Sequence, residues 1–390
     1  MSDKDLSLDE KNNTPLLSIA IPTKNRYETL IPVLEALLEN IVDDDYEIVI
    51  QDNSDNNESI EEWLKVSNDN RVNYYFRKES LSQSENSNLA IGNCQGEYII
   101  FIGDDDFVSP YICDIVKKMK HKQIYCLIYT PGNYYWKEVN FAKKSYLHQN
   151  QVLYLPRKIS SNLIKKVSVI ELKKVLDQGV VSMLGLPKIY HGIVKKSILD
   201  QVKEKWGSYI PGASPDMASA VALSLVIDYC NYISHPVSIT GVSVKSTAGL
   251  GAKNAHIGKL EEQKFLPKNI ADTWDKNIPR IWTGSSIYAQ SAFEVLGKCS
   301  LYKINYFALY AHMYTYHANL KSHIDSAKKH IKLPLVIKNF IIIYYMLAIF
   351  IKRCVGKIKR SFGIYWLRGY GTFDSVDKCM KFLKNIQHKL

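Results

Sequence analysis

The stretch Tyr98–Asp106 reads YIIFIGDDD, five large side chains followed by a glycine and three aspartates. A short, uninterrupted apolar run that ends in a turn residue is typical of a strand buried on both faces of a sheet. Three adjacent carboxylates repel one another, and burying them without partners costs roughly several kcal/mol each. The stretch therefore predicts a buried strand that leads directly into a polar site.

Three segments on the N-terminal side of this stretch resemble it: Leu17–Thr23 (LSIAIPT), Tyr46–Gln51 (YEIVIQ) and Val72–Phe76 (VNYYF). Amphipathic helical patterns lie between them, and we expect Asn25 and Glu28 to form the capping box of the first helix. Strands that alternate with helices pair in parallel through right-handed crossovers. The fold class predicted is α/β, with a Rossmann-like, mostly parallel sheet flanked by helices.

Polar residues follow three of these strands, at Pro22–Arg26, Asp52–Ser54 and Asp104–Asp106. In open α/β sheets the ligand site lies outside the carboxyl ends of the strands, so we expect these segments to share one site. Carboxylate oxygens next to a phosphate ligand suit Mg²⁺ or Mn²⁺. The alternative for the aspartates is an acidic turn that caps a helix starting near Ser109.

The order and spacing of these motifs resemble family 2 glycosyltransferases, which have the GT-A fold. The resemblance is carried by Ile21–Arg26, Asp52–Ser54, Ser84–Asn88, Gly96–Tyr98 and Asp104–Asp106. It covers the first 110 residues, thins after residue 120 and is lost in the C-terminal part. No single motif is specific, whereas their combination is.

The resemblance implies an inverting, metal-dependent transferase that uses a nucleotide-diphospho-sugar. Asp52 would hydrogen-bond the nucleotide base, Asp104 would contact the ribose, and Asp106 together with Asp104 would bind the Mn²⁺ or Mg²⁺ cofactor. The residues implied in donor binding are Pro22, Thr23, Asn25, Arg26, Asp52, Ser54, Asn88, Asp104 and Asp105. The alternatives are a turn residue for Asp52 and an ordinary helix residue for Asn88.

A carboxylate must also deprotonate the attacking hydroxyl of the acceptor. Ser214-Pro215-Asp216 opens an apolar helix, which places Asp216 in its first turn. The helix dipole is expected to lower the pKa of Asp216 and keep it ionised. Asp216 matches the family's base position, although Pro-Asp replaces the usual Glu-Asp pair. The alternative is a common aspartate at a helix start.

The remaining sequence is less informative. We expect hairpins and loops over the site in residues 131–180, a structural role for His191, and a solvated loop at 241–246. In that loop Lys245 could alternatively offset diphosphate charge. A boundary near residues 247–254 is predicted to separate a GT-A domain (1–250) from a helical C-terminal region (251–390), with long helices near 281–298 and 303–321.

The formal net charge of +11 is concentrated in the last seventy residues, where 15 Lys and Arg face 3 Asp. A nucleic-acid binder carries its charge on the recognition fold, so this distribution argues against nucleic-acid binding. The seven scattered cysteines show no zinc spacing and indicate reduced thiols in the cytoplasm.

The longest apolar run, Phe340–Ile351, is shorter than a bilayer span and is followed at once by a basic cluster. Together these favour a helix in the membrane interface, so we expect peripheral contact through residues 333–368. The alternative is a buried helix with a solvated basic end, and the C-terminal helices could also mediate self-association. The polar N-terminus, Met1–Thr14, lacks the pattern of an export signal, which favours the inner face of the cell membrane.

Three functions are compatible with these observations. The first is sugar transfer to a glycan or lipid-linked glycan in bacterial surface-polysaccharide synthesis. The second is nucleotidyl transfer on the same fold, which usually needs a glycine-rich loop where this chain has Thr23–Arg26. The third is a non-enzymatic, membrane-bound scaffold for glycan assembly, against which the presence of Asp52, Asp104, Asp106 and Asp216 argues.

Overall fold

The computed structural model of this 390-residue chain describes residues 14–141, 145–183, 185–247, 249, 257–297 and 301–387. Its first hundred residues alternate strands with helices, as the apolar pattern predicts. The elements are β1 (Leu17–Thr23), α1 (Tyr27–Asn40), β2 (Tyr46–Asp52), α2 (Glu58–Ser67), β3 (Val72–Phe76), α3 (Gln83–Gly92) and β4 (Tyr98–Phe101).

The predicted capping box of the first helix is wrong. Helix α1 begins after Arg26, which makes no side-chain cap, while Asn25 adopts a left-handed conformation and bonds to Asp55 instead. The capping box is found at α3, where Ser82 accepts from the Glu85 backbone N–H and the Glu85 carboxylate accepts from Ser82. The side chain of Asn25 therefore connects the loop after β1 to the loop after β2.

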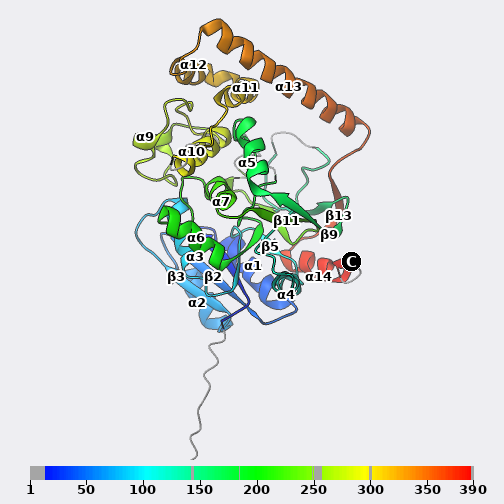
Figure 1. Ribbon diagram of the computed structural model, residues 1–390. Coiled ribbons are helices and arrows are strands. Elements are labelled where there is room, and N and C mark those ends of the chain that lie inside the picture. The colour runs from blue at the N-terminus through cyan, green and yellow to red at the C-terminus, as the bar shows by residue number, and fades with distance from the viewer. Residues whose placement is uncertain are drawn as a thin grey trace, which may run out of the picture.

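The main sheet has eight strands in the order β3-β2-β1-β4-β10-β6-β11-β9 (Figure 1). Strands β3, β2, β1 and β4 are parallel, β10 is antiparallel to both of its neighbours, and β11 is parallel to β6. The added strands are β6 (Cys126–Tyr129), β9 (Ser160–Val167), β10 (Gly192–Lys195) and β11 (Tyr229–Ser234). Strand β9 is also antiparallel to its neighbour β11, so the sheet is mixed. The α/β fold class, with a sheet flanked by helices, is confirmed.

A second sheet of five strands was not expected from the sequence. Its order is β13-β8-β7-β12-β5, and β7 and β8 form an antiparallel pair, as the hairpins expected in residues 131–180 would. The strands are β5 (Phe107–Val108), β7 (Gly132–Tyr135), β8 (Val152–Pro156), β12 (Ser238–Val242) and β13 (Leu367–Thr372). This sheet brings β12 against the aspartate triplet.

Helices cover the main sheet on both faces, and the C-terminal part is mostly helical, as predicted (Figure 1). The predicted helices near 281–298 and 303–321 correspond to α10 and α11. The helices after β4 are α4 (Ile112–His121), α5 (Ser168–Asp177), α6 (Lys196–Trp206), α7 (Pro215–Ser224), α9 (Ile270–Thr273), α10 (Gly284–Leu296), α11 (Tyr306–Tyr316), α12 (Lys321–Lys329), α13 (Leu335–Ser361) and α14 (Val376–Gln387), with 3₁₀ turns at Leu260–Glu262 and Ala318–Leu320.

After α13 the chain returns to its N-terminal half. Strand β13 pairs with β8, and α14 packs on α1, where the Asn40 side-chain amide donates to Asp377. The boundary predicted near 247–254 falls mostly outside the described residues, so the division at residue 250 stays a prediction.

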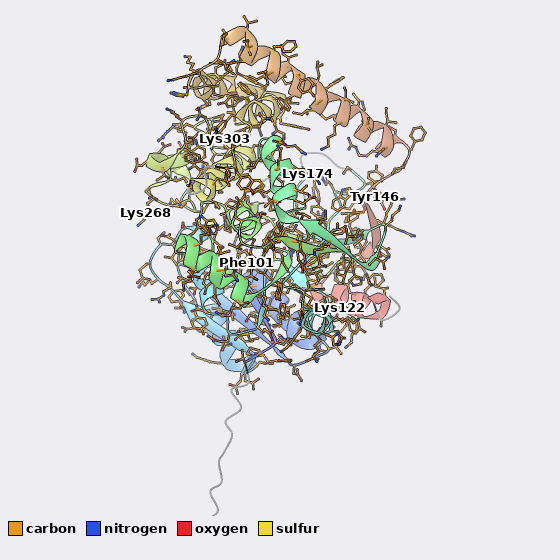
Figure 2. All side chains as sticks on the ribbon, in the orientation of Figure 1. Phe101, Lys122, Tyr146, Lys174, Lys268 and Lys303 are labelled. Atoms are coloured by element: carbon orange, nitrogen blue, oxygen red, sulfur yellow. The ribbon has the colours of Figure 1, made fainter. Side chains whose placement is uncertain are left out.

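The core lies on both faces of the main sheet. Phe101 at the end of β4 is buried in the middle of the molecule, whereas Lys122, Lys174, Lys268 and Lys303 project from its surface (Figure 2). The aspartates that follow β4 therefore enter the interior from the end of a buried strand.

Candidate functional site

The aspartate triplet lies in the turn between β4 and β5. Asp104 and Asp106 have no exposed surface and Asp105 has 3%. The Asp106 N–H donates to the Gly103 carbonyl, which tightens the turn and directs the three carboxylates to different partners. Each of them is held by groups from other parts of the chain.

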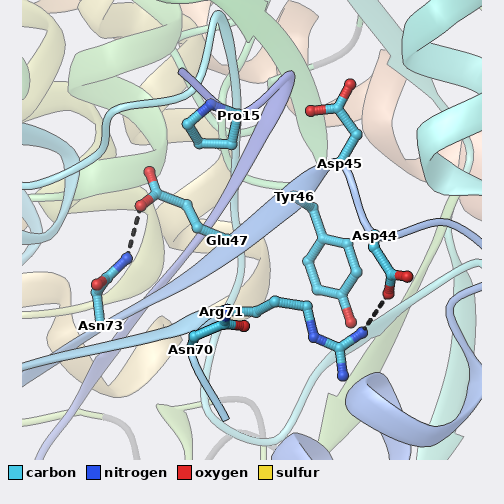
Figure 3. A pocket seen from close by; sticks show the side chains of 8 residues that line it. All are labelled: Pro15, Asp44, Asp45, Tyr46, Glu47, Asn70, Arg71 and Asn73. Carbon is cyan, nitrogen blue, oxygen red and sulfur yellow. Dashed lines mark hydrogen bonds and ion pairs between the residues drawn. The ribbon is translucent and has the colours of Figure 1, made fainter. Parts of the chain in front are cut away.

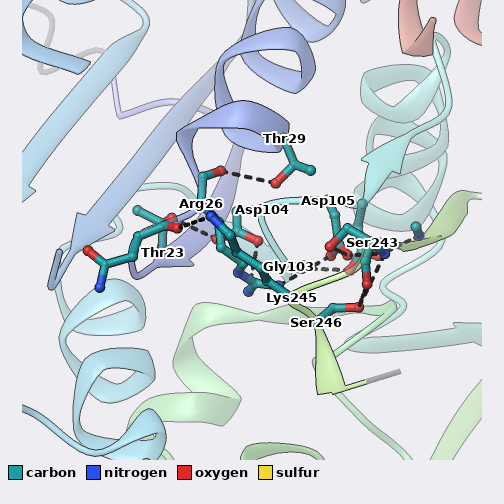
Figure 4. Close-up of polar contacts among 12 residues, drawn as sticks. Thr23, Arg26, Thr29, Gly103, Asp104, Asp105, Ser243, Lys245 and Ser246 are labelled. Carbon is teal, nitrogen blue, oxygen red and sulfur yellow. Dashed lines mark hydrogen bonds and ion pairs between the residues drawn. The ribbon is translucent and has the colours of Figure 1, made fainter. Parts of the chain in front are cut away.

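Asp104 binds two residues of the loop that follows β1 (Figure 4). The Thr23 hydroxyl donates to Asp104 Oδ2 at 2.6 Å, and the Arg26 guanidinium lies 2.7 Å from Asp104 Oδ1. This second oxygen receives no well-aligned hydrogen bond, so the contact with Arg26 is chiefly electrostatic. Burial raises the pKa of Asp104 to about 7, although the charge of Arg26 opposes the rise.

Asp105 is held by the segment after β12 (Figure 4). Its Oδ2 accepts from the Ser243 backbone N–H at 3.0 Å and from the Ser243 hydroxyl at 2.6 Å. Arg26 also reaches this residue, with 4.0 Å between Arg26 Nη1 and Asp105 Oδ1. Burial raises the pKa of Asp105 despite these donors.

Asp106 has the densest set of partners. The backbone N–H groups of Gly103 and Gly241 each donate to it at 2.7 Å, and the Tyr190 hydroxyl donates at 3.0 Å. His191 Nε2 lies 3.2 Å from Asp106 Oδ2. Burial by itself would raise the pKa of Asp106, but His191 and the two backbone donors outweigh it and hold this pKa below its usual value.

One expectation about this region is wrong. Residues 241–246 do not form a solvated loop: Gly241 is at the end of β12, and Ser243 and Ser246 are buried because they bond the aspartate turn. Lys245 is exposed and pairs with Glu28, on α1. His191 is buried against Asp106, and the structural role expected of it stays a prediction. The local sequence carries no signal for these contacts, which join residues more than eighty positions apart.

Asp52 at the end of β2 is completely buried and fully hydrogen-bonded. Its Oδ1 accepts from the Ser54 N–H, and its Oδ2 accepts from the hydroxyls of Tyr27 (2.5 Å) and Tyr74 (2.9 Å). Ser54 in turn accepts from the Asn25 N–H at 2.7 Å. The predicted donor residues after β1 and β2 are therefore brought together.

A hollow opens beside this group, at the carboxyl end of β2. It has a volume of about 510 Å³ and is lined by Asn25, Tyr27, Glu28, Asp55, Asn56, Glu58 and Ser59. A second hollow of about 540 Å³ lies where β2 begins, lined by residues that include Tyr46, Glu47 and Arg71 (Figure 3). The first of these is at the ligand edge of the sheet, and the second is at the opposite edge.

The side chain of Asn88 bonds to a distant part of the backbone, and its role in donor binding stays a prediction. Both ends of its side-chain amide bond the backbone of Ile210, whose N–H donates at 2.9 Å and whose carbonyl accepts at 3.2 Å. Asn88 therefore ties α3 to the segment that precedes α7. Pro22, the other residue predicted to line the donor site, is half-buried in β1.

Asp216 lies in the first turn of α7, as predicted, and is partly exposed. The Tyr288 hydroxyl, from α10, donates to its Oδ2 at 3.3 Å. The expected lowering of the Asp216 pKa by the helix dipole is wrong: burial raises this pKa, against the lowering effects of His191, Tyr288 and Lys188. The charges of His191 and Asp106 both act on the pKa of Asp216, so this carboxylate lies near the triplet.

The carboxylates as arranged do not fit a preformed cation site. Within the described part of the chain, no three His, Cys, Asp or Glu side chains converge as metal ligands. Each aspartate of the triplet is engaged instead by hydrogen-bond donors or by Arg26. A Mn²⁺ or Mg²⁺ ion bound by Asp104 and Asp106 stays a prediction.

The fold and the polar edge of the sheet define an α/β domain with a buried acidic centre that faces a partly exposed carboxylate. Comparison with known proteins identifies the domain: residues 18–170 match the sequence model of "Glycosyl transferase family 2", so this part of the chain is a family 2 glycosyltransferase domain. The expected family is confirmed.

Two known proteins are similar in sequence to this chain. "Putative colanic acid biosynthesis glycosyl transferase WcaA" of Escherichia coli K12 is 32% identical over 111 residues, 28% of this chain and 39% of that protein. "GalNAc(5)-diNAcBac-PP-undecaprenol beta-1,3-glucosyltransferase" of Campylobacter jejuni is 25% identical over 309 residues, 76% of this chain and 86% of that protein. The match thus spans less than half of the first relative and most of the second.

Among solved structures, Staphylococcus aureus TarS 1–349 in complex with UDP-GlcNAc is 12% identical, with a TM-score of 0.42. The alignment covers 58% of this chain and 58% of that one. A TarS crystal structure is 14% identical with a TM-score of 0.41, over 59% of this chain and 37% of that one.

Proposed function

We propose that this chain is an inverting glycosyltransferase that moves a sugar from a nucleotide-diphospho-sugar to a hydroxyl of a glycan or lipid-linked glycan. The observation that carries the proposal is the convergence of Arg26, the buried aspartate triplet and Asp216 at the carboxyl edge of the sheet in a family 2 domain. The names of both relatives support polysaccharide or glycan synthesis.

The donor side of the site is the edge formed by the loops after β1, β2 and β4. The hollow beside Asp52 supports binding of the nucleotide base there, and Arg26, 22% exposed, offers a cation held in place by Asp104. A guanidinium fixed in this way can pair with diphosphate oxygens without first losing side-chain freedom. The backbone N–H groups of Gly241 and Ser243 hydrogen-bond Asp106 and Asp105 and keep the aspartate turn in position.

Asp216 is proposed as the base. In the transfer step the acceptor oxygen forms a bond to the anomeric carbon while the bond from that carbon to the diphosphate breaks. The proton of the acceptor hydroxyl passes to Asp216, and the nucleoside diphosphate leaves with the electron pair. A carboxylate with a raised pKa is a stronger base than an ordinary one, which suits this role near neutral pH.

A divalent cation, Mn²⁺ or Mg²⁺, belongs to the proposal on grounds of charge. Three buried carboxylates face one guanidinium, Arg26, and a bound donor adds the negative charge of its diphosphate. A cation supplies the compensating charge when bound. Because the triplet carboxylates are already engaged, the ion would have to replace some of their present partners.

The acceptor and the cellular site are part of the same proposal. The Campylobacter relative is named for a glycan joined through diphosphate to undecaprenol, which supports a lipid-linked acceptor. We place the chain on the cytoplasmic face of the cell membrane, in peripheral contact through residues 333–368, with self-association through the C-terminal helices as a further property to test. The alternative function is a non-enzymatic scaffold at that membrane.

The test is calorimetric binding of a panel of nucleotide diphosphates to the full chain, with Mn²⁺ and with EDTA, followed by donor turnover. We expect one nucleotide to bind, more tightly with Mn²⁺, and Asp106→Ala to abolish turnover while Asp114→Ala, at an exposed position of α4, leaves it unchanged. Equal affinity in EDTA would overturn the cation. Absence of binding to every nucleotide would overturn the transferase in favour of the scaffold.

A further inference from the structure

Helix α13 (Leu335–Ser361) presents a continuous apolar surface that no part of the described chain covers. It lies along the outer edge of the molecule, packed against α11 on one side only (Figure 1). It is also the helix that is long and apolar enough to cross a bilayer, and 11% of its most apolar window is buried. Nine of its exposed apolar residues form what we call the α13 stripe: Val336, Phe340, Ile343, Tyr344, Leu347, Phe350, Ile351, Val355 and Ile358, each 47% to 81% exposed.

The opposite face of α13 is joined to the soluble part of the protein by polar contacts. The Lys338 ammonium is buried and donates to the Lys328 carbonyl at 3.0 Å. The Asn305 amide donates to the Tyr345 hydroxyl at 2.7 Å, and the Arg353 guanidinium lies 5.0 Å from the ring centre of Tyr316. These contacts settle which face of the helix is turned outward.

The stripe continues for the whole length of the helix. Its members recur every three or four residues, so they share one face over about 33 Å from Val336 to Ile358. The helix carries no acidic residue, and its basic residues fall at positions other than those of the stripe: Lys338, Lys352, Arg353, Lys357, Lys359 and Arg360. One face of α13 is therefore apolar. The basic residues of its C-terminal third, Lys352 to Arg360, border this face, and we call them the basic flank.

We propose that α13 lies in the plane of an anionic lipid surface, with the α13 stripe inserted among the acyl chains and the basic flank against the headgroups. An apolar face bordered by lysines and arginines has this chemistry. The inference adds an orientation and a lipid class to the proposed membrane contact, and it is independent of the transfer chemistry.

Two other arrangements fit the contacts less well. A helix that crosses the bilayer would either carry α11, with its polar groups, into the hydrocarbon or break the bonds of Lys338 and Tyr345 to its neighbours. A second copy docked on the stripe would bring two all-cationic helices together. An anionic lipid surface satisfies both the apolar face and the charge.

Vesicle flotation with the full chain tests the lipid. We expect binding to phosphatidylglycerol-containing vesicles, and little binding to phosphatidylcholine alone. Phe340→Glu with Leu347→Glu should weaken binding roughly 100-fold or more, whereas Val66→Glu, at a residue of α2 that is 82% exposed, should change nothing. Donor turnover on a soluble acceptor should survive in both variants, which separates failure of this inference from failure of the transferase.

A charge series separates headgroup attraction from apolar insertion. Lys352→Gln, Lys357→Gln and Lys359→Gln together should lower affinity for the anionic vesicles roughly 100-fold. The control with the same change in net charge replaces three exposed lysines elsewhere: Lys65, Lys78 and Lys122. Equal effects of the two triple variants would overturn the assigned surface.

Depth measurement distinguishes lying from crossing. A fluorophore is attached in turn at Phe340→Cys, Leu347→Cys or the native Cys354, which is exposed. All chains carry Cys299→Ser, and those labelled at position 340 or 347 also carry Cys354→Ser. An in-plane helix gives one shallow depth for all three, about 5–10 Å. Depths that differ by about 20 Å between 340 and 354 would show a crossing helix and overturn the inference. A lipid-free dimer that Phe340→Glu and Leu347→Glu dissociate, without vesicle binding, would assign the stripe to a second copy and also overturn it.

Discussion

The guanidinium of Arg26 and the carboxylate of Asp104 form a 2.7 Å ion pair between the loops that follow β1 and β4, two neighbouring parallel strands. Asp104 is completely buried, whereas Arg26 keeps 22% of its side-chain surface exposed. The pair therefore joins the acidic interior of the site to its solvent-facing edge, where the proposed donor would bind.

Removing Arg26 should destabilise the protein as well as weaken donor binding. Arg26→Gln leaves a buried carboxylate uncompensated, and we expect a loss of about 3 kcal/mol in the free energy of unfolding. Adding Asp104→Asn should restore most of it. Urea unfolding measures both, and Lys173→Gln, which breaks an exposed pair with Asp177, should cost less than about 1 kcal/mol. Equal losses for Arg26 and Lys173 would contradict the buried pair.

Asp216→Asn should lower kcat by about 10²- to 10⁴-fold and leave nucleotide affinity unchanged, because the base acts on the acceptor proton. In a plot of kcat/KM against pH, activity falls on the acid side as the base becomes protonated. Because the pKa of Asp216 is raised, this acid limb should lie above the ordinary aspartate pKa near 3.9. Activity should therefore rise as pH increases through this raised pKa, where the carboxylate becomes ionised. Tyr288→Phe removes a hydrogen bond that lowers this pKa, so it should move the limb further up. A limb that does not move would exclude Tyr288 as a partner of the reacting carboxylate.

Gly241 allows β12 to approach the aspartate turn. A Cβ there would lie 1.7 Å from the Asp105 carbonyl oxygen, so Gly241→Ala must push β12 away from Asp106. We expect a loss of about 2–3 kcal/mol in unfolding free energy and a more than tenfold loss in donor affinity. Gly284→Ala, in the first turn of α10 with no atom within 4 Å of its Cβ, should be neutral or slightly stabilising. A Gly241→Ala variant with normal stability would refute the close approach.

His312 should make the fold sensitive to mild acid. Burial on α11 lowers the pKa of His312 to about 4, so below pH 6.5 the unfolded chain binds a proton that the folded chain does not. The contribution is intact above pH 6.5, is lost as pH falls toward 4, and amounts to about 2–3 kcal/mol by pH 4.5. His312→Gln should remove this part of the acid dependence in urea unfolding at pH 7.5, 5.5 and 4.5. Parallel pH profiles for the two proteins would contradict it.

Much of the candidate site was predictable because its residues follow apolar runs. Each strand of the first hundred residues is recognised by its own composition, and polar residues at the carboxyl ends of parallel strands must lie at one edge. This reasoning located Arg26, Asp52 and the triplet, and the helix start at Pro215 located Asp216. Local patterning also favoured α13 as an amphipathic helix.

The expectations that failed all depended on contacts between distant residues. Asn25 was assigned to a helix cap because it precedes Glu28, but its side chain bonds Asp55. The solvated loop at 241–246 is buried, and the helix-dipole argument for Asp216 omitted the burial that dominates its pKa. A pKa shift caused by burial cannot be predicted from a short stretch of sequence, because burial depends on which distant segments pack on the residue.

The sequence by itself determined the alternation of strands and helices, the acidic edge and the amphipathic character of the C-terminal helix, because these follow from periodicity and local composition. The tertiary structure decided which groups meet there: Gly241, Ser243 and His191 against the triplet, β13 and α14 against the N-terminal half, and the outward direction of the α13 stripe. These contacts come from segments far apart in the chain, and their free energy arises only when the fold brings them together and removes water from between them.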